Sequence, residues 1–216
     1  DSMAVSVERI KKTGKIAEVT ACYTGDIDNP ARSKYGLEYF AELARRIEGM
    51  GAHILCIKDM AGLLRPQAAR MLITRLREVT ALPIHLHTHD TSGNGIATYI
   101  AAIESGVHIV DVALAPMAGL TSQPSMNALI AAMRGHPKET GLTNKMMQPL
   151  ADLICGPQTV HCRLYLRDDE DDECAGGVAP ESGSACEGGW LETLCMVDGE
   201  YWWCEDGVWS NQDDKD

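Results

Sequence analysis

Residues 53–90 read HILCIKDMAGLLRPQAARMLITRLREVTALPIHLHTHD, and this stretch sets the fold class. It begins with an apolar run at 53–57 that is typical of a buried strand. Pro66 then opens a segment whose apolar residues recur at helical spacing. A second apolar run follows at 83–88. Two strands joined by a helix predict a parallel pair, because parallel strands need a crossover connection.

The same alternation of strand and helix extends on both sides of this stretch. Four strand–helix units predict an α/β fold with a parallel sheet, whose strands are apolar throughout because both faces are covered. A (β/α) barrel and an open doubly wound sheet fit this pattern equally well, and four units are about half of an eight-stranded barrel. The remaining predicted elements are strands at 16–23 and 108–112 and helices at 37–50, 96–103 and 124–133.

The charge divides the chain near residue 153. The net charge is −12, yet residues 154–216 alone carry −13 and the first 153 residues carry +1. All four Trp and six of the eight Cys also follow residue 153. We therefore predict two domains, a barrel-like one at 1–153 and an irregular, poorly ordered, acidic Cys- and Trp-rich tail at 154–216. The tail reads as an out-of-frame or fused segment, an acidic interaction tail, or a small Cys-stabilised module.

Composition also excludes several classes of function. Neither half has a basic stripe, so nucleic-acid binding has no electrostatic support. No stretch approaches the roughly 18 apolar residues of a membrane span. The first 15 residues, DSMAVSVERIKKTGK, have no apolar core of a signal peptide and instead suggest an amphipathic helix. We expect a cytoplasmic location.

Three histidines alternate at the end of the third predicted strand, in the run HLHTHD at 85–90. Alternate residues of a strand share a face, so His85, His87 and His89 point the same way. Imidazoles at this spacing can bind a divalent metal, and the carboxyl ends of barrel strands are where active sites lie. The alternative is a set of hydrogen-bonded, inert side chains at a strand–loop junction.

Lys58 ends the second predicted strand and precedes Asp59. A lysine at this place is partly removed from water, which favours the neutral amine. A neutral amine can take up carbon dioxide as a carbamate, which is an oxygen ligand for a metal. An ion pair between Lys58 and a carboxylate such as Asp59 is the alternative. The nearby run TSGNG at 91–95 allows either close approach of a ligand or a simple turn.

Four motifs, in this order and spacing, resemble the carboxyltransferase domains of pyruvate carboxylases. The similarity runs from about Met3 to Leu153 and implies part of a (β/α)8 TIM barrel of the biotin-dependent carboxylase and HMG-CoA-lyase-like superfamily. Oxaloacetate decarboxylase α subunits share the KDMAG element, but HTHDTSGNG is closer to pyruvate carboxylases. The motifs are CYTGDI, HILCIKDMAGLLRP, PIHLHTHDTSGNGIA and GLTSQPSMNAL.

The resemblance implies a metal site. The family's lysine in IKDMAG is carboxylated and binds the metal, and it matches Lys58. The last two histidines of the HxHxHD run are ligands, and they match His87 and His89. The cofactors implied are zinc or manganese, and biotin carried by another domain. Four further residues match positions that support the ligands or form the substrate loop in the family: His85, Asp90, Thr91 and Ser92.

The resemblance also implies an activity and partners. In the family, a carboxyl group passes from carboxybiotin to pyruvate and gives oxaloacetate, the second half-reaction of a ligase in pyruvate metabolism and gluconeogenesis. Pyruvate, carboxybiotin and the other domains of a pyruvate carboxylase are the implied partners. The location implied is the cytoplasm, or the mitochondrial matrix in a eukaryote.

Departures from the family pattern limit these expectations. The fourth metal ligand, an aspartate in an RDAHQS-like motif, has no match, and neither do the substrate-binding arginine, the proton-shuttling threonine or the AMKM-like biotin motif. We therefore expect the isolated chain to be inactive. The alternatives are a non-catalytic metal-binding or interaction fragment and a protein like the oxaloacetate decarboxylase α subunit. A half barrel also leaves two open edges and an uncovered apolar interior face, which predicts oligomers.

Overall fold

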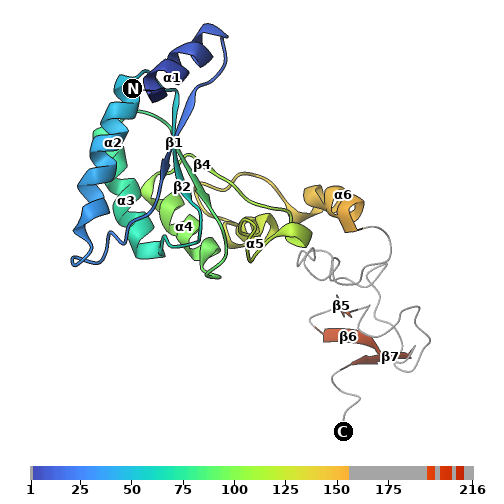
Figure 1. Ribbon diagram of the computed structural model, residues 1–216. Coiled ribbons are helices and arrows are strands. Elements are labelled where there is room, and N and C mark those ends of the chain that lie inside the picture. The colour runs from blue at the N-terminus through green and yellow to red at the C-terminus, as the bar shows by residue number, and fades with distance from the viewer. Residues whose placement is uncertain (1, 156–193, 198–199, 206–207, 212–216) are drawn as a thin grey trace. The chain divides into compact units, whose positions relative to one another are not determined.

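A computed structural model describes residues 2–155, 194–197, 200–205 and 208–211 (Figure 1). The chain forms two compact units, Asp1–Thr143 and Asn144–Asp216. The first unit contains a parallel sheet in the order β1-β2-β3-β4, so the predicted α/β class with four strand–helix units is confirmed. The strands are β1 (Glu18–Cys22), β2 (Ile54–Asp59), β3 (Ile84–Thr88) and β4 (Ile109–Val110).

Helices connect consecutive strands, as a parallel sheet requires. Local sequence explains where they begin and end: Pro66 occupies the first turn of α3, and Gly106 ends α4 with a φ of 104° in the left-handed region. The helices of this unit are α1 (Ser2–Lys12), α2 (Leu37–Gly49), α3 (Pro66–Val79), α4 (Gly95–Ser105) and α5 (Met126–Ala132), with 3-10 turns η1 (Ser33–Tyr35) and η2 (Ala115–Met117).

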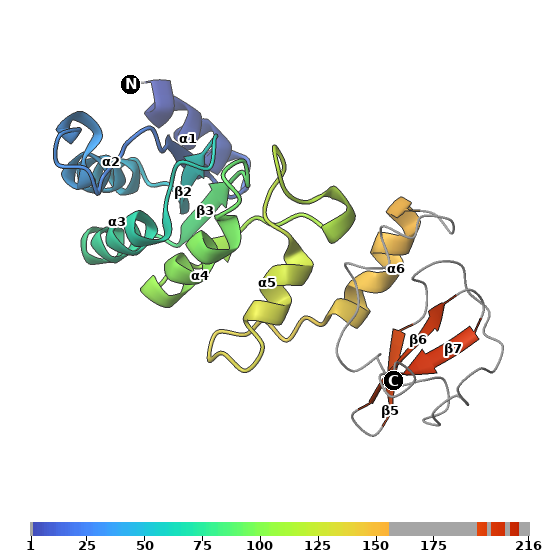
Figure 2. The ribbon, with the colours of Figure 1, turned by 90° about the horizontal axis from the view of Figure 1, so that it is seen from below.

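The two faces of the sheet differ. Helices α2, α3 and α4 cover one face, which we call the covered face (Figures 1 and 2). Burial alternates along β1 and β3, so every second side chain belongs to this covered face. Large apolar side chains fill it, each at most 1% exposed: Leu55, Ile57, Ile84 and Leu86. The core of the unit lies between this face and the helices.

The opposite face, which we call the open face, carries mainly polar side chains. They include Glu18, Thr20, Lys58, His85 and His87, which alternate with the apolar residues of the covered face. The expectation of strands that are apolar throughout, with an apolar interior face, is therefore wrong. The alternation was hidden in β2, because its residues on the open face include Ile54 and Cys56.

The second unit begins with α6 (Asn144–Cys155) and contains an antiparallel sheet of β5 (Leu194–Val197), β6 (Glu200–Glu205) and β7 (Val208–Asn211). The description of 154–216 as an irregular, poorly ordered tail stays a prediction. Pairing of Val197 with Glu200 and of Glu205 with Val208 leaves two residues between strands, and both pairs are Asp-Gly in sequence. Asp-Gly is the strongest short hairpin signal. The acidic run at 167–173 lies outside the described residues.

Within the described part of the chain, no helix has the length and apolar character needed to cross a bilayer.

Candidate metal centre

Strand β3 and the residue that follows it bring two imidazoles together. The Nε2 atoms of His87 and His89 lie 3.3 Å apart, inside the 3–4 Å expected of two ligands that share one cation. Their ring planes cross at 72°. With metal–nitrogen bonds of about 2.0–2.1 Å, a separation of 3.3 Å corresponds to an angle of roughly 105–110° at the cation. This angle suits a tetrahedral site.

The far side of each ring is held by an oxygen acceptor. His87 Nδ1 lies 2.7 Å from Asp111 Oδ2, and His89 Nδ1 lies 2.6 Å from the carbonyl oxygen of Thr121. A carbonyl oxygen only accepts, so the proton of His89 belongs on Nδ1 and the lone pair on Nε2. The same assignment follows for His87 from the Asp111 carboxylate. When both rings are neutral, this assignment leaves a lone pair on each Nε2 directed at the same point, the arrangement found where histidines ligate metals.

The loop after η2 presents the carbonyl that holds His89. Leu120 in this loop has a φ of 51°, the left-handed region that a side chain with a Cβ disfavours. The loop is fixed on both sides of Thr121, because Gly119 N–H donates to the Gln123 carbonyl and Asp90 N–H donates to the Ser122 carbonyl. Backbone strain of this kind is stored where the surrounding structure enforces it.

Lys58 lies beside His87 on the open face. The two residues are partners in the parallel register of β2 and β3, and the Lys58 side chain is half-buried. Asp59 faces the other way: its buried carboxylate accepts from the N–H groups of Leu63 and Leu64 and from the Thr88 hydroxyl. The alternative of a Lys58–Asp59 ion pair is therefore wrong. Among the described residues, no ion pair or hydrogen bond involves the Lys58 side chain, which suits a lysine that carries a carbamate.

The remaining predicted loop residues serve the turn that leads into α4. Asp90 accepts from Gly95 N–H at the start of the helix, and the Ser92 hydroxyl donates to the Gly62 carbonyl. Both glycines are required here: a Cβ on Gly62 would lie 2.6 Å from the His89 carbonyl oxygen, and one on Gly95 would lie 2.5 Å from a Pro124 carbon. Thr91 is exposed. These motifs therefore shape the loops around the histidines.

Asp111, which the sequence analysis missed, ties the site to the fourth strand. Burial raises its pKa, but the hydrogen bond from His87 and the charge of His85 outweigh burial, so the net pKa lies below its ordinary value. Tyr99, fully buried on α4, accepts from Thr88 N–H and donates to the Asp111 carbonyl at 2.6 Å. Burial raises the pKa of Tyr99 well above its ordinary range, so the hydroxyl remains a donor.

A second group of metal-ligand types lies further along the open face. Single ligand atoms of Glu18, Cys56 and His85 all fall within 4.8 Å of one another. Burial, followed by the charge of Glu18, raises the pKa of Cys56 to about 11, so its sulfur keeps its proton near neutral pH. His85 already faces a carboxylate on each side, with Nδ1 3.1 Å from Glu18 and Nε2 3.0 Å from Asp111. The second contact is an ion-pair approach that does not meet hydrogen-bond geometry.

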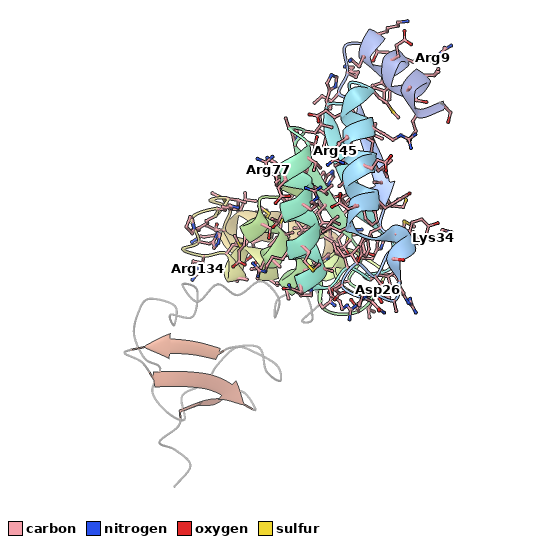
Figure 3. All side chains as sticks on the ribbon, turned by 90° about the vertical axis from the view of Figure 1, so that its left-hand side faces the viewer. Arg9, Asp26, Lys34, Arg45, Arg77 and Arg134 are labelled. Carbon is pink, nitrogen blue, oxygen red and sulfur yellow. The ribbon has the colours of Figure 1, made fainter. Side chains whose placement is uncertain are left out.

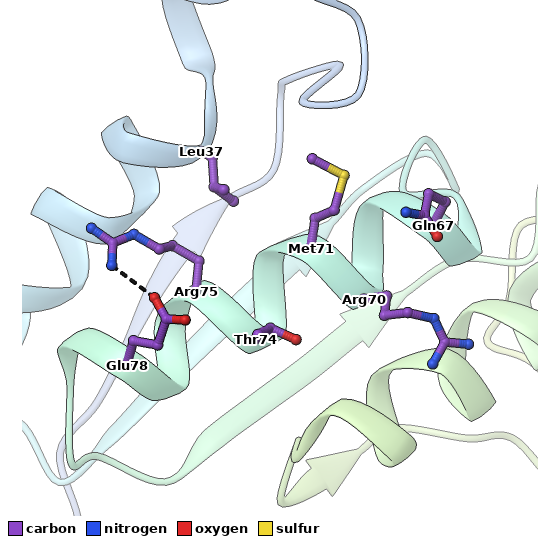
Figure 4. A pocket seen from close by; sticks show the side chains of 7 residues that line it. All are labelled: Leu37, Gln67, Arg70, Met71, Thr74, Arg75 and Glu78. Atoms are coloured by element: carbon purple, nitrogen blue, oxygen red, sulfur yellow. Dashed lines mark hydrogen bonds and ion pairs between the residues drawn. The ribbon is translucent and has the colours of Figure 1, made fainter.

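Two other places on the first unit hold charged side chains that pair with one another. A hollow of about 350 Å³ on the outer side of α3 is lined by Leu37, Met71 and Arg75, among others (Figure 4). Arg75 is bound there by Glu78 at 2.8 Å. Asp26 lies in the loop after β1 and is bound by Arg65 at 2.6 Å. Figure 3 labels Asp26 and Lys34 of the same loop. Neither place combines a free polar group with an enclosed cavity.

The HMGL-like family matches residues 2–154. The chain belongs to this family. The match spans the four strand–helix units and α6, so the HMGL-like region includes every residue of the candidate centre.

Pyruvate carboxylases are among the relatives of this HMGL-like chain. It is 55% identical to the pyruvate carboxylase of Staphylococcus aureus over 173 residues, which is 80% of this chain and 15% of that protein. It is 49% identical to the mitochondrial pyruvate carboxylase of Homo sapiens over 140 residues, which is 64% of this chain and 12% of that one. The first alignment is longer than 153 residues, so the boundary predicted at residue 153 stays a prediction.

Solved structures agree with this relationship. The carboxyl transferase domain of Rhizobium etli pyruvate carboxylase, solved with pyruvate, superimposes with a TM-score of 0.67 at 48% identity and covers 68% of this chain and 25% of that one. The same domain solved with pyruvate and biocytin matches equally well. The chain thus has part of the TIM-barrel carboxyltransferase fold, and it spans 15% or less of the curated relatives described above.

Proposed function

We propose that this chain provides the metal-binding half of a carboxyltransferase barrel in an enzyme that carboxylates pyruvate. In that reaction the carboxyl group of carboxybiotin passes to the methyl carbon of pyruvate and gives oxaloacetate. One observation carries the proposal. Two histidine lone pairs converge at 3.3 Å, beside a lysine that has no ionic partner among the described residues.

Neighbouring residues fix His87 and His89 in the tautomer that a metal ligand needs. Asp111 keeps the proton of His87 on Nδ1, and the Thr121 carbonyl keeps that of His89 on Nδ1, so neither ring must change tautomer before it binds a cation. Lys58 extends from the neighbouring strand, where its amine can take up carbon dioxide and offer a carbamate oxygen. Nitrogen and oxygen ligands of this kind fit zinc or manganese. A divalent cation bound there supplies positive charge next to a developing enolate.

The chain on its own is expected to be inactive. Carboxyl transfer requires pyruvate to be positioned and its enolate to be stabilised as charge develops. The fourth ligand and the substrate-binding arginine of the family have no match in residues 1–216. We therefore propose that pyruvate and carboxybiotin meet this site only when the rest of a carboxyltransferase barrel is present.

A chimera tests the proposal. Residues 2–154 would replace the aligned segment of the Staphylococcus aureus pyruvate carboxylase, to which the chain is 55% identical. We expect the chimera to form oxaloacetate from pyruvate, bicarbonate and ATP, and we expect its His87→Ala variant to lose nearly all of that activity. A folded chimera with bound metal but no oxaloacetate formation would sink the proposal and favour a non-catalytic metal-binding fragment.

The isolated chain gives a second test. It should bind Co²⁺ or Zn²⁺ through Lys58, His87 and His89, with lower affinity than an intact four-ligand site, and show no turnover above background. His53→Ala is the matched control, because His53 lies at the opposite end of β2 and its side chain only accepts the Ala17 N–H. Binding that survives His87→Ala, or that is lost in His53→Ala, would contradict this assignment.

We further propose that the chain acts as part of a larger assembly. Within the described residues, β1 and β4 each pair on one side only, so each presents an unpaired edge. Other barrel strands of a pyruvate carboxylase, or a second copy of the chain, would cover these edges. Light scattering on the purified chain should report oligomers, and a stable monomer would count against this part of the proposal. We expect the assembly to work in the cytoplasm or the mitochondrial matrix.

A further inference from the structure

A row of alternating acids and histidines crosses the open face of the sheet. Glu18 on β1 lies 3.1 Å from His85 Nδ1, and His85 Nε2 lies 3.0 Å from Asp111 Oδ1. The other oxygen of Asp111 lies 2.7 Å from His87 Nδ1. The row therefore runs from the first strand to one of the two converging imidazoles, and its His85–Asp111 contact is a close approach outside hydrogen-bond geometry.

Asp111 is the weakly held member of this row. It directly follows β4, which has two residues, and its N–H donates to the Leu86 carbonyl over a long 3.3 Å. Its side chain is 41% exposed, so without a second partner the carboxylate can turn toward water. Tyr99 fixes the backbone carbonyl of Asp111 but not its carboxylate. What fixes the carboxylate is therefore its pair of contacts with His85 and His87.

His85 is better enclosed than Asp111. Its side chain is 12% exposed, and carboxylates stand at both of its ring nitrogens. Rotation of the ring would break the contact with Glu18 and the contact with Asp111 together. The spacing along β3 supports this arrangement. His85 and His87 are two residues apart, so their side chains share a face and both can reach one carboxylate.

We propose that His85 is a positioning residue, held by Glu18, which fixes the Asp111 carboxylate and through it the orientation of His87. The proposal rests on the proposed function, because it concerns how a metal ligand of that site is held. Partners of metal-binding histidines typically change metal affinity about 10- to 100-fold when they are removed. We expect that range for His85→Leu, and a smaller loss for Glu18→Gln, which lies one contact further away.

The test uses Co²⁺ titration of the whole chain, followed by visible absorption, together with nitrogen-detected NMR of the histidine rings. The wild type should bind Co²⁺ and show His87 protonated on Nδ1. His85→Leu should weaken binding about 10- to 100-fold and mix the two tautomers of His87. His85→Gln, whose amide can donate to Asp111, should recover part of both. His53→Gln, remote from the row, should leave both unchanged.

The outcomes separate this inference from the proposed function. A wild-type chain without His87-dependent Co²⁺ binding contradicts the proposed function. A wild type that binds, with a folded His85→Leu variant of equal affinity and unchanged His87 tautomer, overturns the role of His85. Should His85→Leu fail to fold, Glu18→Gln probes the same contact, and equal affinity there overturns the proposal. Loss of a second Co²⁺ equivalent in Cys56→Ser would overturn it in favour of a metal site at Glu18, Cys56 and His85.

Discussion

The covered and open faces of the four-stranded sheet have different roles, although the same strands contribute side chains to both. On β3, Leu86 is fully buried under the helices, while its neighbours His85 and His87 lie on the open face at 12% and 20% exposure. On β2, Ile57 and Asp59 face the helices, and Lys58 between them faces the other way. A strand of five or six residues therefore supplies both the core and the candidate metal ligands.

The comparison shows how polar groups are treated on each side. On the covered face, the Asp59 carboxylate is saturated by N–H groups of the following loop and by the Thr88 hydroxyl. On the open face, acids and histidines contact one another in a row that ends at the two facing Nε2 atoms of His87 and His89. A saturated buried carboxylate contributes to folding, whereas a row that ends in two ring nitrogens facing each other is suited to bind a cation.

The largest effect is expected on the covered face. Leu86→Ala removes a fully buried side chain and leaves a cavity, so the free energy of unfolding should fall by about 2–5 kcal/mol. The neighbouring change His87→Ala should lower it by less than about 1 kcal/mol while removing metal binding. Urea unfolding of both variants measures the difference. Equal destabilisation by the two changes would break the comparison of the faces.

Tyr99→Phe should have the next largest effect. The Tyr99 hydroxyl joins the two faces, because it accepts from Thr88 N–H and donates to the Asp111 carbonyl. Its loss leaves a buried N–H without this acceptor, which costs about 1–3 kcal/mol. Urea unfolding should show that loss, and Co²⁺ affinity should fall because Asp111 moves. An unchanged affinity in a destabilised variant would place Tyr99 in the core alone.

The fold was largely predictable from sequence, and the site only in part. The order of four strands and their helices follows from apolar runs and helical spacing, and Pro66 and Gly106 mark helix ends. The close approach of His87 and His89 follows from strand alternation alone. The alternation of β2 was missed because Ile54 and Cys56 make its open-face positions look apolar.

The contacts that hold the site were not predictable, because they join residues far apart in the chain. Glu18 lies 67 residues from His85, and Asp111 lies 24 from His87. Asp111 also follows a strand of two residues, too short for a pattern. In the tail, by contrast, a local signal was overlooked: Asp-Gly at 198–199 and at 206–207, each between runs that form strands.

A smaller effect on the free energy of unfolding is expected from the protonation of His108, which lies at the amino end of the parallel strands. His108 accepts Ile84 N–H through Nδ1, and burial, followed by the charges of Arg77 and Lys138, lowers its pKa below the ordinary 6.5. Below the ordinary pKa the unfolded chain binds the proton first, so the free energy of unfolding falls as pH drops through about 6.5 and levels off below the folded pKa. His108→Gln should flatten this part of the curve. An identical pH dependence would show that His108 does not contribute.

The smallest effect is expected from the exposed charge network on the helices, which contrasts with the row on the open face. Arg75 contacts both oxygens of Glu38 at 2.8 and 3.0 Å and lies 2.8 Å from Glu78, distances as short as those of the Glu18–His85–Asp111 row. Hydrogen bonding from Arg75 lowers the pKa of Glu38. These groups reach water, however, where salt screens charges and ordering long side chains costs entropy. Arg75→Gln should therefore shift the urea midpoint only slightly, and about 0.5 M salt should abolish that shift.

The effect of Glu18→Gln on Co²⁺ affinity should persist at the same salt concentration, because His85 is enclosed. If salt removed both effects equally, the contacts of the row would be screened as strongly as those of the exposed network. Enclosure of His85 on the open face would then not strengthen the row.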